Sequence, residues 1–122
     1  MGAAREHHRL EVIRGDVVVS SAPGEYGKPR PALVVQSDLY NATHASLVIC
    51  PITSYLLDAP LFRISVQPSA ENGLKADCQV MVDKIAAVRR ERINKRIGKF
   101  SGALMAEVDR ALLLWLNLGV VE

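Results

Sequence analysis

The order of elements in this sequence predicts an α+β fold, in which a strongly curved antiparallel sheet or small barrel carries one C-terminal helix. Short runs rich in β-branched residues recur between residues 16 and 100, separated by clusters of Gly, Pro, Asn and Asp. The one long helical pattern follows all of these runs. Many short strands followed by a single helix are typical of a domain in which the helix packs on the sheet.

The bulk composition fits one small domain. The chain has 122 residues, of which 49% are hydrophobic, and a net charge of +2, which permits an anionic partner without requiring one. We take residues 1–12 as a disordered or tag-like tail and residues 13–122 as the domain. A mean hydropathy of +0.13 is high for so short a chain and suggests that a partner covers some apolar surface.

Neither a membrane span nor a signal peptide is predicted. No apolar run approaches the roughly 18 residues that a span needs, and the charged N-terminus lacks an apolar segment. We therefore expect a cytoplasmic protein that does not contact a membrane. Cys50 and Cys78 lie in strand-like runs, which favours buried, reduced thiols over a disulfide.

The first half of the chain predicts three strands and a long loop. The expected elements are a strand over 16–20, a loop over 21–31, a strand over 32–36, a helical turn over 37–41 capped by Ser37 or Asp38, and a strand over 46–50. A loop of about ten residues in so small a domain is more often functional than not. Pro51 is expected to end the third strand.

The second half predicts further short strands. Leu61–Val66 alternates, with Phe62, Ile64 and Val66 on one face and Arg63 and Ser65 on the other, which is the pattern of a half-exposed strand. The remaining expected elements are a turn centred on Asn72-Gly73, strands over 78–82 and 85–88, a basic segment over 89–96 and a last strand over 97–100.

The helix is predicted over Ser101–Leu118, with Ser101 as N-cap and Gly119 placed to end it. Its apolar residues recur at helical spacing, at Leu104, Met105, Val108, Leu112, Trp115 and Leu116. We expect this stripe to pack on the sheet, in preference to forming a free docking face. Trp115 is then an anchor in the core or at an interface.

Several kinds of chemistry lack their sequence patterns. The chain has no Cys-x-x-Cys and no His-Glu-x-x-His, so no metal site is predicted. It also has no Gly-x-Ser-x-Gly elbow, Walker motif or Gly-x-Gly-x-x-Gly, so neither a serine nucleophile nor a nucleotide cofactor is indicated. A catalyst of this composition would work with arginine, hydroxyls, carboxylates and backbone donors.

Two segments place polar side chains at strand ends. In Gly27–Val35, Arg30 stands between two prolines directly before an apolar run, and in Pro51–Ser54, Thr53 and Ser54 follow another apolar run. We expect these ends to meet, with Arg30 and Thr53 at the centre of a site. The structural alternatives stay open: an arginine paired with a carboxylate, and hydroxyls that only cap a turn.

Such a site suits RNA cleavage. RNA carries its own nucleophile, the 2′-hydroxyl, so an enzyme that aligns it and stabilises the phosphorane needs neither a metal nor a covalent residue. The planar arginine fork fits a phosphorane and is always charged. Tyr26 and Tyr55, on the two loops, could stack bases, and Lys28 and Lys84 could contact phosphates. The basic run 89–96 is either a solvated face or a track for the phosphate backbone.

At these residues the chain resembles the MazF/PemK toxins. The similar blocks, in order, are residues 14–18, 27–35, 37–41, 51–54, 73–77, 82–85, 97–99 and 104–112. Each block alone is a weak match, but the ordered set is specific, and it covers nearly all of the chain from Ile13 to Gly119.

The resemblance implies an SH3-like barrel that forms a homodimer. It implies the toxin of a type II toxin–antitoxin pair, a metal-independent and sequence-specific endoribonuclease that cuts single-stranded RNA through a 2′,3′-cyclic phosphate. The antitoxin's C-terminal segment would block the RNA groove. Arg30 matches the family's catalytic arginine and Thr53 its catalytic Thr or Ser, and the loop over 21–28 matches the mobile cover of the RNA site.

Two departures from the family pattern concern the substrate contacts. Some members carry an arginine and an aspartate two residues apart in the fifth strand, where this chain has Met81 and Asp83, and many have an arginine near Ala86 or Ala87.

Thr53 is a poor base at its usual pKa, so its expected role is orientation and charge stabilisation, with Asp83 as the candidate base and Ser54 as a further orienting group.

Two other functions stay open at this point. The CcdB toxins share this fold and poison DNA gyrase through residues of the C-terminal helix, without nuclease activity. Trp115 fits that alternative, but Arg30 and Thr53 have no role in it. The third hypothesis is a barrel that binds nucleic acid without cleaving it.

Overall fold

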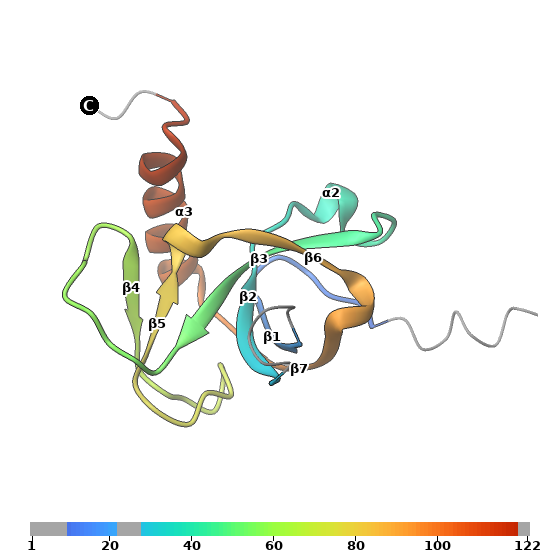
Figure 1. Cartoon of the computed structure of the whole chain (residues 1–122), viewed down its shortest axis with the longest axis horizontal. Coiled ribbons are helices and arrows are strands. Elements are labelled where there is room, and N and C mark those ends of the chain that lie inside the picture. Colours follow the sequence, from blue (N-terminus) through green and yellow to red (C-terminus); the bar gives the residue numbers. More distant parts are fainter. Residues whose placement is uncertain (1–9, 22–27, 120–122) are drawn as a thin grey trace, which may run out of the picture.

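The computed structural model describes residues 10–21 and 28–119 and confirms the α+β class with a C-terminal helix. Figure 1 shows β1, β2 and β7 curled together, with α3 standing beside β4 and β5. The elements are β1 (Asp16–Ser20), β2 (Arg30–Val34), α2 (Asp38–Asn41), β3 (Ser46–Thr53), β4 (Arg63–Val66), β5 (Cys78–Met81), η1 (Val82–Lys84), β6 (Ala86–Arg89), η2 (Arg90–Arg92), β7 (Ile93–Lys99) and α3 (Gly102–Leu116).

The strands form an antiparallel sheet that curls like a barrel without closing. Along the sheet the order is β4-β5-β3-β2-β1-β7, and β6 also pairs with β3. The path ends at β4 on one side and at β7 on the other. The strand β3 therefore has β2 on one edge and shares its other edge between β6 and β5.

The strand β3 is longer than predicted, because Pro51 does not end it. Residues 46–49 of β3 pair with β6, whereas Ile52 and Thr53 pair with β5. Pro51 lies between these two sections, where β3 exchanges one partner for the other. Proline lacks a backbone N–H and is tolerated in a sheet where the ladder needs no donor. The strand thus continues to Thr53 and ends at the predicted site.

Each face of the sheet carries its own core cluster. The first includes Val17, Leu33, Cys50 and Ile52 together with Val108 and Ala111 of α3. The second includes Val18, Ala32, Val34, Leu47, Ile49 and Val88. Successive side chains of a strand point to opposite faces, so the apolar residues of β2 contribute to both clusters. The unbroken apolar pattern of this strand predicted that both of its faces are buried.

The start of β1 is tied to the helix by a partly buried arginine. Arg14 donates from Nε to the carbonyl oxygen of Val35 at 2.8 Å and from Nη2 to Asp109 of α3 at 2.6 Å. These bonds join the ends of β1 and β2 to α3. On the N-terminal side, Val12 is buried and Leu10 packs against the second cluster, so core contacts begin before residue 13.

Only the N-terminal half of α3 packs fully on the sheet. Ser101 accepts a hydrogen bond from the Leu104 amide, as its predicted role as N-cap requires, and Asn117 rather than Gly119 supplies the left-handed C-cap. Val108 and Ala111 are buried, while Trp115 contacts Phe62 with ring centroids 5.3 Å apart but stays 47% exposed. Among the described residues, no helix is long and apolar enough to cross a membrane.

The smaller departures from the predicted elements have local causes. The strand β2 begins at Arg30, two residues earlier than expected, because Arg30 pairs with Ser20 of β1. The basic segment after β6 forms η2 and the first half of β7. Cys50 and Cys78 are buried and free, as predicted.

The turn at Asn72-Gly73 packs directly on β7. Gly73 has φ +71°, and a Cβ built there would lie 2.1 Å from the carbonyl oxygen of Ile97. Gly98 faces this turn, since its Cβ would lie 2.3 Å from the backbone of Asn72. The backbone of the turn and that of β7 thus leave no room for a side chain.

We predict that Gly73→Ala lowers the free energy of unfolding by at least about 2 kcal/mol, through the strained φ and the clash with Ile97. The matched control is Gly102→Ala, because no atom lies within 4 Å of that position. The control should leave stability unchanged or raise it slightly. Urea denaturation of both variants measures this, and equal stabilities would contradict the packing of the turn.

Candidate active site

The two strand ends that the sequence singled out lie side by side. β2 and β3 pair with Ala32 opposite Pro51 and Leu33 opposite Cys50. The paired residues end at Ala32 and Pro51; continued by two residues, this register would place Arg30 opposite Thr53, on the same face as Ala32 and Pro51. Neighbouring strands are about 5 Å apart. A single group can therefore contact both side chains.

Arg30 and Thr53 line one cavity of about 480 Å³. Its polar lining residues among those described are Ser20, Arg30, Thr53 and Lys84. The apolar ones are Pro31, Ala32, Ile49, Pro51, Ile52, Met81, Ala86 and Val88. Ala32, Ile49 and Val88 also belong to the second core cluster, so the cavity continues that core towards the solvent. It has apolar walls and two cations.

Within the part of the chain that the structure describes, Arg30 makes no ion pair. Its side chain is exposed, and no carboxylate among the described residues lies within ion-pair distance of the guanidinium. The alternative of an arginine paired with a carboxylate at a strand end therefore finds no support in this part of the chain. The guanidinium fork is available to an anion.

Thr53 is fixed by the loop that follows it. Its Oγ1 accepts a hydrogen bond from the Tyr55 amide at 3.0 Å. Opposite Thr53 on β5, Gln79 accepts from the Leu57 amide at 2.9 Å and donates to the Leu57 carbonyl oxygen at 2.8 Å. The hydroxyl thus serves as a turn hydroxyl and still keeps its own proton to donate.

Asp83 does not line the cavity. Its carboxylate receives two hydrogen bonds from Arg63, at 3.0 Å from Nε and 3.4 Å from Nη2. Arg63 is only 7% exposed, although the alternation of β4 predicted an outward side chain. That prediction was wrong because the ion pair with Asp83 compensates the buried charge.

The other residues predicted to contact RNA differ in whether they line the cavity. Lys84 lines it. Lys28, Ser54 and Tyr55 are exposed and are not among the lining residues. Tyr26 lies outside the described residues. Met81 and Ala86, where the resemblance led us to look for arginine, both line the cavity and add apolar surface.

Much of the basic run holds the fold together. Arg90 is buried and donates to the carbonyl oxygens of Asn41 and His44. Arg92 donates to the carbonyl oxygen of Ser21, and Arg96 pairs with the buried Asp16 at 2.9 Å. The run is therefore neither a simple solvated face nor one continuous track for phosphates.

Sequence reasoning missed Ser20 as a member of the site. It ends β1 opposite Arg30, lines the cavity and is 3% exposed. Its hydroxyl oxygen has no hydrogen-bond partner among the described residues. The available signal was its position two residues after the inward-facing Val18, where the alternation of the strand predicts the same face.

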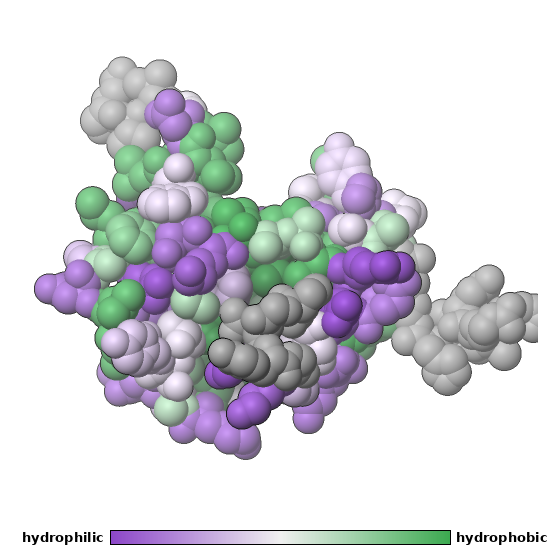
Figure 2. All heavy atoms as spheres, viewed as in Figure 1, coloured by the Kyte–Doolittle hydropathy of each residue, from purple (hydrophilic) through white to green (hydrophobic). Residues whose placement is uncertain are grey.

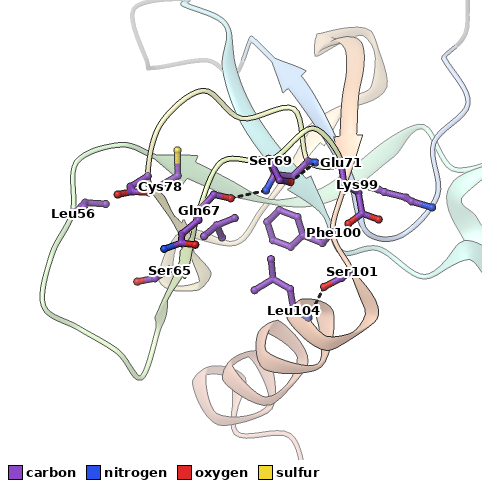
Figure 3. Close-up of a pocket in the computed structure, with 13 residues that line it drawn as sticks. Leu56, Ser65, Gln67, Ser69, Glu71, Cys78, Lys99, Phe100, Ser101 and Leu104 are labelled. Carbon is purple, nitrogen blue, oxygen red and sulfur yellow. Dashed lines mark hydrogen bonds between the residues drawn. The ribbon is translucent and has the colours of Figure 1, made fainter.

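A second cavity, of about 570 Å³, lies between the Asn72-Gly73 turn and the start of α3 (Figure 3). Phe100 and Leu104 form its apolar side, and Glu71 and Asp77 line it along with Lys99. It contains none of the predicted site residues. Its acidic side chains make this cavity less suited to a polyanion than the cavity at Arg30.

Neither cysteine suits a nucleophilic role. Burial raises the pKa of the Cys50 thiol to about 12, and burial also raises the pKa of Cys78, so both stay protonated at neutral pH. Within residues 10–21 and 28–119, no group of three His, Cys, Asp or Glu side chains could hold a metal ion.

We predict that Asp83→Ala lowers the free energy of unfolding by about 3 kcal/mol, because it leaves the buried charge of Arg63 uncompensated. The double variant Arg63→Met/Asp83→Leu removes both charges and should be markedly more stable than the single variant. Denaturation midpoints of the three proteins measure this. If both variants lose the same stability, the pair does not hold the charge of Arg63.

Comparisons with known proteins agree with this fold. Residues 11–116 match the family model described as "PemK-like, MazF-like toxin of type II toxin-antitoxin system". A curated relative, the "Probable endoribonuclease MazF" of Mycolicibacterium smegmatis, is 41% identical over 106 residues, covering 86% of this chain and 96% of the relative. Endoribonuclease EndoA of Bacillus subtilis is 27% identical over 111 residues, covering 88% and 96%.

Solved structures share the fold. "Mycobacterium tuberculosis toxin MazF-mt6" matches with a TM-score of 0.74 at 17% identity, covering 86% of this chain and 99% of that one. "Endoribonuclease in complex with its cognate antitoxin from Mycobacterial species" matches with a TM-score of 0.75 at 23% identity, covering 90% and 99%. From the family model and the curated relatives together, the chain belongs to the PemK/MazF family of toxins of type II toxin–antitoxin systems.

Proposed function

We propose that this protein is a sequence-specific endoribonuclease that cleaves single-stranded RNA without a metal ion, and that it acts in the cytoplasm. The observation that carries the proposal is that Arg30, at the start of β2, and Thr53, at the end of β3, line one cavity. Arg30 has no carboxylate partner among the described residues. The names of the curated relatives, endoribonucleases of the same family, support the same reaction.

The reaction requires only that the substrate be held in line. The 2′-oxygen attacks the adjacent phosphorus, the bond from phosphorus to the 5′-oxygen of the next nucleotide breaks, and a 2′,3′-cyclic phosphate and a 5′-hydroxyl form. The Arg30 fork neutralises the non-bridging oxygens of the phosphorane. The Thr53 hydroxyl, fixed by the Tyr55 amide, donates to one of these oxygens or orients the 2′-hydroxyl.

We infer that orientation and charge stabilisation supply most of the catalysis. No carboxylate is among the described residues that line the cavity. Asp83 would have to leave its pair with Arg63 to act as a base. The 2′-hydroxyl proton then passes to water, and water protonates the leaving 5′-oxygen. On this account, the double variant Arg63→Met/Asp83→Leu still cleaves RNA.

The cavity favours single-stranded RNA over a duplex. Its apolar walls suit unstacked bases, which only a single strand can present. Lys84 at the cavity, with Lys28 further out, would contact phosphates, and Tyr55 is exposed for stacking. We propose that the C-terminal segment of a cognate antitoxin covers this same groove. One similar solved structure is of an endoribonuclease in complex with its cognate antitoxin, which supports an antitoxin as partner.

We also propose that the protein is a homodimer. Leu113, Leu114, Trp115 and Leu116 are each 43–47% exposed, and no charged residue follows Arg110 in α3. Figure 2 shows this hydrophobic surface gathered over the free end of α3. A helix end that is apolar on every side is normally buried. The same face of a second copy is complementary to it under two-fold symmetry.

We predict that Arg30→Ala lowers the rate of RNA cleavage in EDTA by about 100-fold or more, because it removes the donors to the phosphorane. Arg30→Lys keeps the charge but loses the planar fork, so its cleavage rate should lie between those of the wild type and Arg30→Ala. Gel analysis of a long mixed-sequence RNA measures the rates and the cut sites. Lys95→Ala, at an exposed position outside the cavity, is the matched control and should cleave normally.

Two outcomes of this assay would contradict the proposal. Unchanged cleavage by Arg30→Ala would remove Arg30 from the mechanism. Inhibition of DNA gyrase that survives Arg30→Ala, without RNA cleavage by the wild type, would instead favour the CcdB-like alternative and a role for the exposed Trp115.

We predict that Leu114→Glu shifts the protein from dimer to monomer, because a charge would be buried in the apolar interface. Sedimentation equilibrium measures the change. Leu39→Glu is the control, since Leu39 is 83% exposed on α2 and should leave the dimer intact. A wild-type protein that is monomeric at micromolar concentration would refute the interface.

A further inference from the structure

Ser20 holds a buried hydroxyl that the fold itself does not use. Only 3% of the residue is exposed, and its Oγ has no hydrogen-bond partner in residues 10–21 and 28–119. Nearly all buried polar groups in proteins are hydrogen-bonded, and leaving one unpaired costs about 1–3 kcal/mol. Since the preceding residue on this face, Val18, is fully buried in the second core cluster, an apolar residue would fit the position better.

The position of Ser20 links this hydroxyl to the proposed site. Ser20 pairs with Arg30 between β1 and β2, and the register of β2 and β3, continued by two residues, would place Arg30 opposite Thr53. The three residues thus form a row across the sheet, with about 5 Å between neighbours. Ser20 is also a lining residue of the cavity.

We propose that Ser20 is a specificity residue, whose hydroxyl bonds the polar edge of a nucleobase that enters the cavity beside the scissile phosphate. The proposal rests on the proposed endoribonuclease function. Rotation about the Cα–Cβ bond of Ser20 turns its hydroxyl towards the entering group. A serine hydroxyl both donates and accepts, so it satisfies either kind of group on a base edge.

The base is the part of a nucleotide that fits this cavity. The cavity has apolar walls that include Ile49, Ala86 and Val88, and its cations are Arg30, which is the β2 partner of Ser20, and Lys84. A phosphate or ribose, which is charged or polar all round, gains most at the cations. A base has apolar faces for the walls and a polar edge for Ser20, so its burial leaves no polar group unpaired.

This assignment predicts opposite effects of one substitution on folding and on binding. Ser20→Ala removes an unpaired buried hydroxyl, so the melting temperature of the free protein should stay the same or rise. The same change should weaken the binding of a single-stranded RNA by about threefold to tenfold, because a base edge loses its partner. An ordinary structural role for Ser20 would lower the melting temperature.

The binding experiment uses an uncleavable RNA that carries a 2′-deoxy nucleotide at the mapped cut site. Wild type and Ser20→Ala are titrated with this RNA and with versions in which one base near the cut lacks a single polar edge group. For the base in the cavity, the effects of Ser20→Ala and of the base change should not add, since both remove the same hydrogen bond. Ser46→Ala, at the opposite end of β3, is the matched control and should bind all RNAs like the wild type.

The possible failures are distinguishable. If the wild type cleaves RNA but Ser20→Ala binds every RNA equally well and keeps the same cut sites, Ser20 does not read a base and the proposed function stands. If the effects add at every base position, the hydroxyl contacts no base edge. If the wild type neither cleaves nor binds RNA, both proposals fall.

Discussion

The register of β2 between β1 and β3 is the constraint on which the candidate site depends. It brings Ser20, Arg30 and Thr53 from three strands into one row. A slip of one residue would turn Arg30 to the other face of the sheet and part it from Thr53. Leu33 and Val34 oppose such a slip, because they are fully buried in core clusters on opposite faces. The packing of the core therefore positions the chemistry.

The cavity combines apolar walls with two cations, Arg30 and Lys84, that have no ion-pair partner among the described residues. No carboxylate among the described lining residues competes with an anion for Arg30. By contrast, the arginines of the basic segment and Arg63 are largely committed to carbonyl oxygens and carboxylates. The number of basic residues in the sequence thus says little about RNA binding. Whether each one already has a partner is the more informative property.

The sequence allowed much of the fold to be predicted, because its local signals agree with the tertiary structure. β1, the cap of α2 by Ser37, the Asn72-Gly73 turn and the Ser101 cap of α3 lie where turn and capping residues indicated them. That Arg30 and Thr53 line one cavity was predictable, because Arg30 directly precedes one apolar run and Thr53 follows another. Where local rules were applied alone, at Pro51 and Arg63, the prediction was wrong. In both cases a partner distant in sequence decided the outcome, β5 for the strand and Asp83 for the arginine.

Ser20 and the free end of α3 show what a sequence pattern cannot supply. A serine after a β-branched run has the same appearance whether its hydroxyl is paired or not, and only the surrounding backbone shows that Oγ has no partner. Similarly, the apolar residues at helical spacing predict that α3 has an apolar face, but they do not predict how much of this face the sheet covers. The sheet covers α3 as far as Leu112, which leaves the following turns exposed.

The central claim is that the substrate supplies the nucleophile to a site built from Arg30 and Thr53. The most direct measurement places a single 2′-deoxy nucleotide at the mapped cut site of an RNA and compares its cleavage and binding with those of the unmodified RNA, in EDTA. The account predicts that cleavage at this site is abolished, that binding changes little, and that the unmodified RNA yields a 2′,3′-cyclic phosphate. Cleavage of the modified RNA at the same site would contradict it, because another nucleophile would then be at work.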